Sequence, residues 1–338
     1  MQGNHHGMAV TMSDIARLAG VSVPTVGRAL NQKGYVSPEV RERVEAAAQK
    51  LGYVPNRMAR ALKSGRSGLI GSLVFGNENN VYQRINRHIM SAAEEKGFHV
   101  VTLQTCGDGS QAIQQLIEMR VDGLAVISHL GIAPELFGRL HQIGIPVVAV
   151  ERTYDLPYVD NIEVRDREAV FHAAQQLLAL GHRHIGMICP SPQDSVEEQR
   201  LEGFHQALEE AGIPREQHEV ELTDSYSTVH GKLAALKLLA RSCVPTALVC
   251  ASDILAAGAM QALYANGLRV PEDISIVGYD NTVAAYLSPP IDSVDLDLSQ
   301  VGEILLNLLE RRRNAPDCPA RTEYLGTTYV ARGTTAQK

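Results

Sequence analysis

The sequence predicts an all-α helix-turn-helix head followed by an α/β body made of two doubly wound lobes. Residues 11–31 have the spacing of two short helices joined at a glycine. From Leu69 onward, short apolar runs alternate with helical stretches, as in parallel α/β sheets. The pattern around Gly71 returns around Gly186, 115 residues later. This offset indicates two copies of one α/β unit.

The head begins with two predicted helices. Ser13 is the expected N-cap of the first helix, which Gly20 ends in the left-handed conformation. Ser22 is the expected cap of the second helix, and Pro24 is tolerated in its first turn. The positions expected to face inward on the second helix are Val26, Ala29 and Leu30.

The start of the second helix is predicted to enter a DNA major groove. Val23, Pro24 and Arg28 are the residues left pointing outward there. An arginine can pair with a guanine edge, and small apolar side chains can contact a thymine methyl group. An ordinary helical hairpin without a DNA partner is the alternative interpretation of the same pattern.

A third helix and a short basic segment complete the head. Ser37 and Pro38 begin the predicted third helix, which ends at Gly52. Residues 57–63 form a basic stretch that exposes one leucine, and a Ser/Gly linker follows. A helix of about seven residues does not persist alone in water, so this one should fold only when something packs on it.

The sequence thus predicts three parts of the chain: a DNA-binding domain over 10–56, a hinge helix and linker over 57–68, and a two-lobed body over 69–333.

The body is predicted to contain two lobes with a ligand cleft between them, because ligands of doubly wound sheets bind beyond the carboxyl ends of the strands. We expect the first lobe to hold residues 69–160 and 292–318, and the second to hold 161–291 and 319–333. The strands predicted in the first lobe are 69–75, 98–103, 123–127 and 147–150, with helices over 82–96 and 133–143.

Charge is distributed unevenly between head and body. The formal charge of the 338 residues is −7. Residues 1–66 contain ten Lys or Arg and four Asp or Glu, which gives +6, whereas the remaining 21 basic and 34 acidic residues give −13. A basic head on an acidic body indicates that the head alone binds a polyanion.

Composition excludes several classes of protein. No apolar run approaches the ~20 residues of a membrane span, and no signal peptide is apparent, so we expect a cytoplasmic location at the nucleoid. The sequence has no Gly-x-Gly-x-x-Gly, P-loop or marked catalytic arrangement, which predicts neither cofactor nor enzymatic activity. No metal site is expected either, because the five cysteines are scattered along the chain and are best interpreted as reduced thiols. They are Cys106, Cys189, Cys243, Cys250 and Cys318.

Several short motifs follow one another along the chain in a characteristic order. In the head they are Ile15-Ala16, Ala19-Gly20-Val21-Ser22, Thr25-Val26 and Leu51-Gly52-Tyr53-Val54-Pro55-Asn56. In the body they are Val121-Asp122-Gly123, Leu180-Gly181-His182-Arg183-His184-Ile185, Arg200-Leu201-Glu202-Gly203-Phe204 and Val277-Gly278-Tyr279-Asp280-Asn281. Through these motifs the chain resembles bacterial repressors of the LacI/GalR family, from Val10 to about Gly333. The resemblance implies lobes of the periplasmic-binding-protein type I kind.

The resemblance also implies a homodimer that binds a pseudo-palindromic operator in double-stranded DNA. The basic helix would be the family's hinge helix, with Leu62 as the leucine that wedges into the minor groove. Thr25, Asn31 and Arg60 would hold phosphates. The chain has no leucine heptad tail, so a dimer is expected rather than a coiled-coil tetramer.

For the small-molecule effector, the resemblance implies a sugar, polyol, sugar acid or sugar phosphate. Arg200 and Asp280 would grip its polar groups. The other residues that the resemblance places in the pocket are Tyr82, Glu151, Tyr226 and Ser252. Arg165 departs from the family pattern and would favour an acidic ligand if it faced the cleft.

Two other classes of protein fit parts of this pattern. A transporter's solute-binding protein shares the two-lobed body, but it lacks a basic head and carries an export signal. A nucleotide-dependent enzyme is disfavoured by the missing phosphate-binding loops. The regulator is therefore the preferred interpretation.

Overall fold

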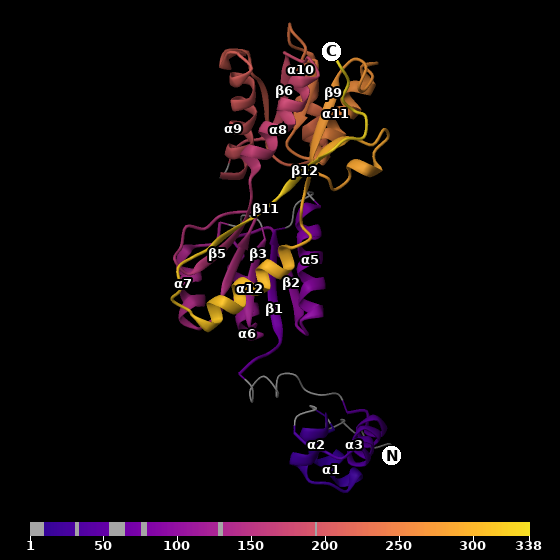
Figure 1. The fold of residues 1–338 in the computed structure, drawn as a ribbon, viewed down its shortest axis with the longest axis vertical. Helices are drawn as coiled ribbons and strands as arrows, with labels where there is room; N and C mark the ends of the chain where they lie inside the picture. Colours follow the sequence, from indigo (N-terminus) through magenta and orange to yellow (C-terminus); the bar gives the residue numbers. More distant parts are fainter. Residues whose placement is uncertain (1–9, 31–33, 54–64, 76–79, 128–130, 193–194) are drawn as a thin grey trace, which may run out of the picture. The chain divides into compact units, whose positions relative to one another are not determined.

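The computed structural model describes residues 10–30, 34–53, 65–75, 80–127, 131–192 and 195–338. They belong to two compact units, Met1–Ser67 and Gly68–Lys338 (Figure 1). No helix in this described part is long and apolar enough to span a membrane.

The described residues of the first unit form three helices, α1 (Met12–Ala19), α2 (Val23–Leu30) and α3 (Pro38–Leu51). The N-cap of α1 is Thr11, so the prediction of Ser13 was wrong. The Thr11 backbone N–H and hydroxyl both donate to the Asp14 carboxylate, at 3.0 and 2.6 Å. A carboxylate reaches back in this way from three residues after the cap, which places Ser13 inside the first turn.

The other predicted caps of this unit are confirmed. Ser22 accepts a hydrogen bond from the Thr25 N–H at 3.4 Å, and Ser37 accepts one from the Val40 N–H at the same distance. The three helices enclose one small core, formed by Ile15, Ala16, Ala19, Val26, Ala29, Val44, Ala47 and Ala48.

The second unit contains two six-stranded sheets built to one plan. The strand order of the first sheet is β11-β5-β4-β3-β1-β2, and that of the second is β12-β10-β9-β8-β6-β7. The first sheet comprises β1 (Leu69–Phe75), β2 (His99–Thr105), β3 (Gly123–Ile127), β4 (Val147–Val150), β5 (Val159–Val164) and β11 (Thr322–Leu325). The second comprises β6 (Ile185–Pro190), β7 (Glu219–Thr223), β8 (Ala247–Cys250), β9 (Ser275–Asp280), β10 (Asp292–Leu296) and β12 (Thr327–Val330). β1 and β6 occupy equivalent positions, in agreement with the 115-residue offset.

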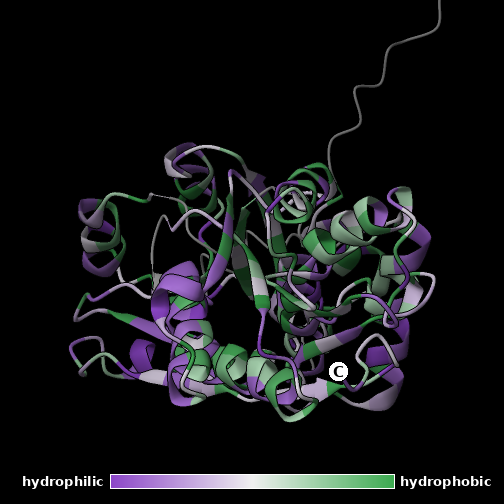
Figure 2. Cartoon of the chain, turned by 90° about the horizontal axis from the view of Figure 1, so that it is seen from above, coloured by the Kyte–Doolittle hydropathy of each residue, from purple (hydrophilic) through white to green (hydrophobic). Residues whose placement is uncertain are grey.

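Helices cover both sheets. The first lobe carries α5 (Val81–Glu95), α6 (Ser110–Glu118), α7 (Pro134–Gln142) and α12 (Val301–Asn314); the second carries α8 (Asp166–Ala179), α9 (Ser195–Glu210), α10 (Thr228–Leu239) and α11 (Asp253–Ala265). Side chains alternate along β1, so that Leu73 packs in the cluster with α6 and α7, whereas Val74 packs in the cluster with α5. The central strands are largely apolar, and the helices around them carry apolar and polar stripes (Figure 2).

The chain crosses between the lobes later than predicted at three places, near residues 160, 291 and 318. β5 pairs with β4 in the first sheet, so this part of the first lobe extends to residue 164 rather than 160. β10 pairs with β9 in the second sheet, and β11 pairs with β5 in the first, which reverses the predicted assignment of both strands. The two lobes have the same topology: the chain forms five consecutive parallel strands in each lobe, β1–β5 and then β6–β10, before it crosses to the other.

Helix α9 approaches α8 so closely that position 203 requires glycine. A Cβ atom on Gly203 would lie 2.1 Å from the Arg167 carbonyl oxygen, a distance that no carbon–oxygen contact tolerates. Arg200 lies one turn earlier on the same helix. The glycine therefore permits the approach that lets Arg200 reach α8.

We predict that Gly203→Ala lowers the free energy of unfolding by about 1–3 kcal/mol, the usual cost of overpacking. Urea unfolding followed by circular dichroism measures it. Gly138→Ala in α7 is the matched control, because its new Cβ would lie 3.5 Å from the Tyr158 hydroxyl, an ordinary contact. The control should equal the parent or exceed it slightly, since alanine is the better helix former. Equal losses in both variants would contradict the close approach of the two helices.

Candidate DNA-binding and effector-binding sites

Helix α2 presents the three predicted reading residues to solvent. Val23, Pro24 and Arg28 are all exposed, and the opposite face of the helix is buried in the head core. Thr25 is half-buried, with its hydroxyl oxygen 2.8 Å from the Ser22 hydroxyl oxygen. The exposure of α2 agrees with a role in reading DNA, while the individual base contacts stay predictions.

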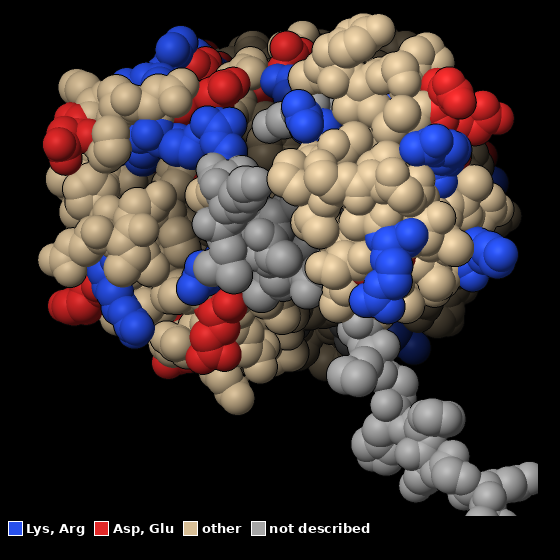
Figure 3. Space-filling model, turned by 90° about the horizontal axis from the view of Figure 1, so that it is seen from below, with Lys and Arg blue, Asp and Glu red and all other residues tan. Residues whose placement is uncertain are grey.

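Three further residues predicted to contact DNA lie outside the described residues. They are Asn31 and Arg60, assigned to phosphates, and Leu62, assigned to the minor groove. Their roles therefore stay predictions. Seen from below, the molecule carries several separate groups of Lys and Arg side chains, with acidic groups among them (Figure 3).

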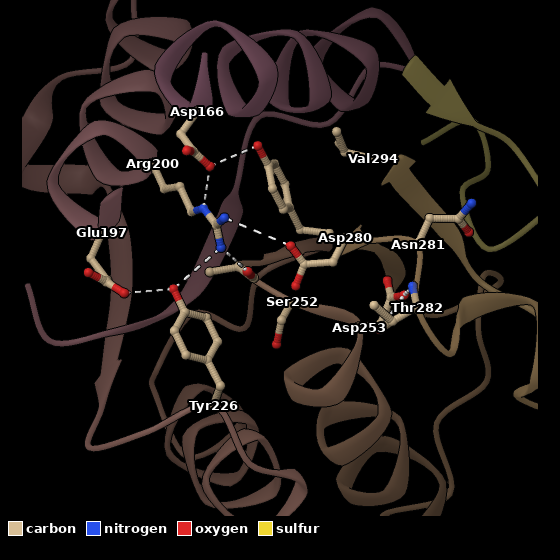
Figure 4. A network of polar contacts seen from close by, with 12 residues as sticks. Asp166, Glu197, Arg200, Tyr226, Ser252, Asp253, Asp280, Asn281, Thr282 and Val294 are labelled. Atoms are coloured by element: carbon tan, nitrogen blue, oxygen red, sulfur yellow. Dashed lines mark hydrogen bonds and ion pairs between the residues drawn. The ribbon is translucent and has the colours of Figure 1, made fainter. Parts of the chain in front are cut away.

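A buried guanidinium lies at the centre of a polar cluster in the second lobe. Arg200 donates from Nε to the Asp166 carboxylate at 2.6 Å and from Nη1 to the Ala251 carbonyl at 2.8 Å (Figure 4). Its guanidinium carbon lies 4.1 Å from the centre of the Tyr279 ring. Burial alone would lower the pKa of Arg200, but the Asp166 carboxylate and its other neighbours raise the pKa well above the usual value. Arg200 therefore stays cationic.

Two of the predicted effector residues contact this guanidinium. Tyr226 accepts a hydrogen bond from Arg200 Nη1 at 3.3 Å and donates its own proton to Glu197 Oε1 at 2.8 Å. Asp280 ends β9, and its Oδ1 lies 3.8 Å from Arg200 Nη2, which is longer than a hydrogen bond. A hydroxyl group beside these two atoms could bridge them by accepting from Arg200 and donating to Asp280.

The first lobe contributes Tyr82, Glu151 and Arg152 to the same region. Tyr82 and Glu151 are buried, and Arg152 Nη2 forms an ion pair across the lobes with Glu197 Oε1 at 3.2 Å. Glu151 Oε2 is buried without a hydrogen-bond partner among the described residues. A buried acceptor of this kind indicates a position where a ligand can bind.

Glu151 has an unusual protonation state. Burial raises the pKa of its carboxyl to about 8, against the opposing effect of the Arg200 and Arg152 charges. The carboxyl therefore holds a proton at neutral pH. In that state it can donate a hydrogen bond as well as accept one.

Ser252 and Asp253 lie at the start of α11 and have structural partners. The Ser252 hydroxyl accepts from the Leu255 N–H at 3.2 Å and caps the helix. Asp253 accepts from the backbone N–H groups of Thr282, Val283 and Ala284, at 2.6, 3.2 and 3.2 Å. Asp253 thereby fixes the loop that follows Asp280.

Arg165 is the predicted effector residue that the structure does not bring into this cluster. Its side chain is about half exposed and pairs with Glu168 at 3.2 Å. Its guanidinium carbon lies 4.6 Å from the centre of the Tyr324 ring on β11. The neighbouring Asp166 contacts Arg200 instead, because the first residue of α8 points toward α9.

Sequence reasoning missed Asp166, Glu197, Arg152 and Arg84. The sequence contained a weak indication of Glu197, since it precedes Arg200 by three residues and therefore lies on the same face of the helix. Asp166 directly follows Arg165, the residue that departs from the family pattern. Arg152 and Arg84 had no signal, because their partners belong to the other lobe.

Two family models match the chain. Residues 11–56 match "Bacterial regulatory proteins, lacI family", and residues 174–335 match "Periplasmic binding protein-like domain". The chain is 33% identical over 329 residues to the ribose operon repressor of Haemophilus influenzae, covering 95% of this chain and 97% of the relative.

Solved structures agree over nearly the same length. The lac repressor dimer bound to operator and the anti-inducer ONPF matches with a TM-score of 0.83 and 30% identity, covering 97% of this chain and 100% of that one. The transcriptional regulator CelR–cellobiose complex matches with a TM-score of 0.70 and 30% identity, covering 96% and 99%. This chain therefore belongs to the lacI family of bacterial regulatory proteins and is a DNA-binding transcriptional regulator.

Proposed function

We propose that this regulator binds an operator by placing α2 in the major groove. Val23, Pro24 and Arg28 would contact base edges, because they are exposed on a helix whose other face is buried. Thr25, Asn31 and Arg60 would contact phosphates, and Leu62 would enter the minor groove. The +6 charge of residues 1–66 supports this division of roles.

We also propose that a small uncharged sugar or polyol binds in the polar cluster around Arg200 and changes operator affinity. The observation that carries this proposal is the 3.8 Å separation of Arg200 Nη2 and Asp280 Oδ1 within a buried site. A ligand hydroxyl suits this separation, and Tyr82 and Tyr226 supply aromatic faces for its C–H groups. The solved relative with cellobiose supports a carbohydrate as the ligand.

Charge favours an uncharged ligand over a sugar acid or phosphate. Arg200 pairs with Asp166, and Arg152 pairs with Glu197. Asp280 adds a further carboxylate beside Arg200. The cluster therefore offers no excess positive charge to compensate an anion.

The exposed apolar face of α10 supports a homodimer. Val229 and Leu233 are 66% and 51% exposed, and Leu236 continues the same helix face. The lac repressor relative was solved as a dimer.

We propose that the protein acts on chromosomal DNA in the cytoplasm. We assign it no catalytic role, as for the regulators that it resembles.

Arg28→Ala is expected to weaken operator binding by about 1–3 kcal/mol and to relax selectivity at one base position per half-site. Fluorescence anisotropy with an operator selected from a randomised duplex library measures both effects. Arg17→Ala on α1 is the control, and it should leave base selectivity unchanged because Arg17 pairs with Asp14 outside the reading helix. Unchanged selectivity of Arg28→Ala would refute the assigned reading helix.

Asp280→Asn is expected to reduce effector affinity about tenfold or more without loss of folding. Asparagine tolerates the left-handed backbone of this position, where φ is +83°. A thermal-shift panel of sugars, polyols, sugar acids and sugar phosphates first identifies a compound that stabilises the parent chain. Titration calorimetry with that compound then compares Asp280→Asn with Asp224→Asn, which changes an exposed carboxylate. Equal affinities for the two variants, or stabilisation by phosphates alone, would contradict the proposed site.

Glu151→Gln is expected to make the unfolding free energy less dependent on pH. The folded pKa of about 8 exceeds the usual 4.5, so the contribution of Glu151 to the unfolding free energy is fully present in acid and is lost as pH rises from about 5 to about 8. Glutamine has the same shape and cannot ionise. The stability of the variant relative to the parent should therefore increase through this window, measured by urea unfolding at several pH values. If the unfolding free energies of parent and variant changed equally with pH, Glu151 would be ionised in the folded chain.

A further inference from the structure

Arg84 joins the first lobe to the turn that carries Asp280. It lies in the first turn of α5, and its Nη1 donates to the carbonyl oxygens of Asp280 and Asn281, the latter at 3.0 Å. Its Nη2 lies 3.2 Å from Asp295 Oδ1 on β10. All three acceptors belong to the second lobe. One side chain thus spans both lobes beside the proposed effector site.

The turn that Arg84 contacts has a conformation that requires support. Asp280 and Asn281 have φ angles of +83° and +48°, a region that residues other than glycine seldom adopt. Within the second lobe, Ser293 accepts from the Asn281 N–H at 3.1 Å, and Arg332 donates to the Asn281 side chain at 2.6 Å. These contacts hold Asn281 from within the second lobe, and Arg84 adds a contact to the Asp280 carbonyl from the first lobe.

We propose that Arg84 is an interlobe positioning residue for effector binding. By holding the two carbonyl groups, it fixes the Asp280 carboxylate beside Arg200. Effector binding in the second lobe then depends on α5 of the first lobe. This inference rests on the proposed effector site, and it adds to that site a contact through which the first lobe responds to the ligand.

The geometry favours arginine over a simple positive charge. A planar guanidinium can donate to two carbonyl groups and a carboxylate at once, whereas an ammonium group on lysine is a compact point charge. Arg84 is 25% exposed, so water can reach the space that its truncation leaves. Asp253 continues to hold residues 282–284 in its absence, and the second lobe should therefore fold.

Hydrogen–deuterium exchange on the full-length chain without effector tests the positioning role directly. In Arg84→Ala, the amides of Asp280 and Asn281 should exchange about tenfold faster than in the parent, while those of residues 282–284, which Asp253 holds, and those of β6 stay unchanged. Arg87→Ala is the matched control, since Arg87 is an exposed arginine on the same helix. The control should leave exchange in this turn unchanged. Equal exchange in the two variants would overturn the proposal.

Effector affinity provides the second measurement. The compound that stabilises the parent chain should bind Arg84→Ala about tenfold or more weakly, and Arg87→Ala within about twofold of the parent. Arg84→Lys should fall between the parent and Arg84→Ala. Faster exchange with unchanged affinity would overturn the link to the effector. If no compound binds the parent, the proposed effector site fails, and the exchange experiment still decides whether Arg84 holds the turn.

Discussion

The buried ion pair between Arg200 and Asp166 organises the polar region of the second lobe. A guanidinium removed from water is unfavourable unless its donors have partners, and loss of one partner from a buried pair commonly costs about 3–5 kcal/mol. Asp166, the Ala251 carbonyl and the Tyr226 hydroxyl are those partners here. They come from α8, the end of β8 and the segment before α10. The position of one cation therefore fixes the relation of several elements.

Close helix packing makes that ion pair possible. The short distance between α8 and α9 depends on the absence of a side chain at Gly203. The glycine of the Arg-Leu-x-Gly-Phe motif and the arginine of the same motif thus serve one purpose. The glycine sets the separation of the helices, and the arginine uses that separation to reach Asp166.

The two lobes are connected by side chains as well as by the chain itself. Arg84 and Arg152 extend from the first lobe to acceptors in the second, at Asp295 and Glu197 respectively. Tyr226 and Arg152 both contact Glu197, which links the proposed ligand region to the first lobe. Such contacts give a physical basis for coupling between a ligand and the arrangement of the lobes, because any change in that arrangement must rearrange them.

The sequence by itself determined the helix-turn-helix, the strands β1, β3 and β4, and the duplication of the α/β unit, because these depend on local periodicity and caps. Through motifs of the family that it resembles, it also predicted Tyr82, Glu151, Arg200, Tyr226 and Asp280 as effector residues. The structure places Tyr226 and Asp280 beside Arg200, while binding of an effector there stays a prediction. The tertiary structure decided the rest. β10 and β11 lie in the opposite lobes from those predicted because a short strand can pair in either sheet, and only long-range pairing selects one. Arg165 lies against Tyr324 while Arg84 and Arg152 reach across the lobes, since the partners of a long charged side chain depend on elements far away in the sequence.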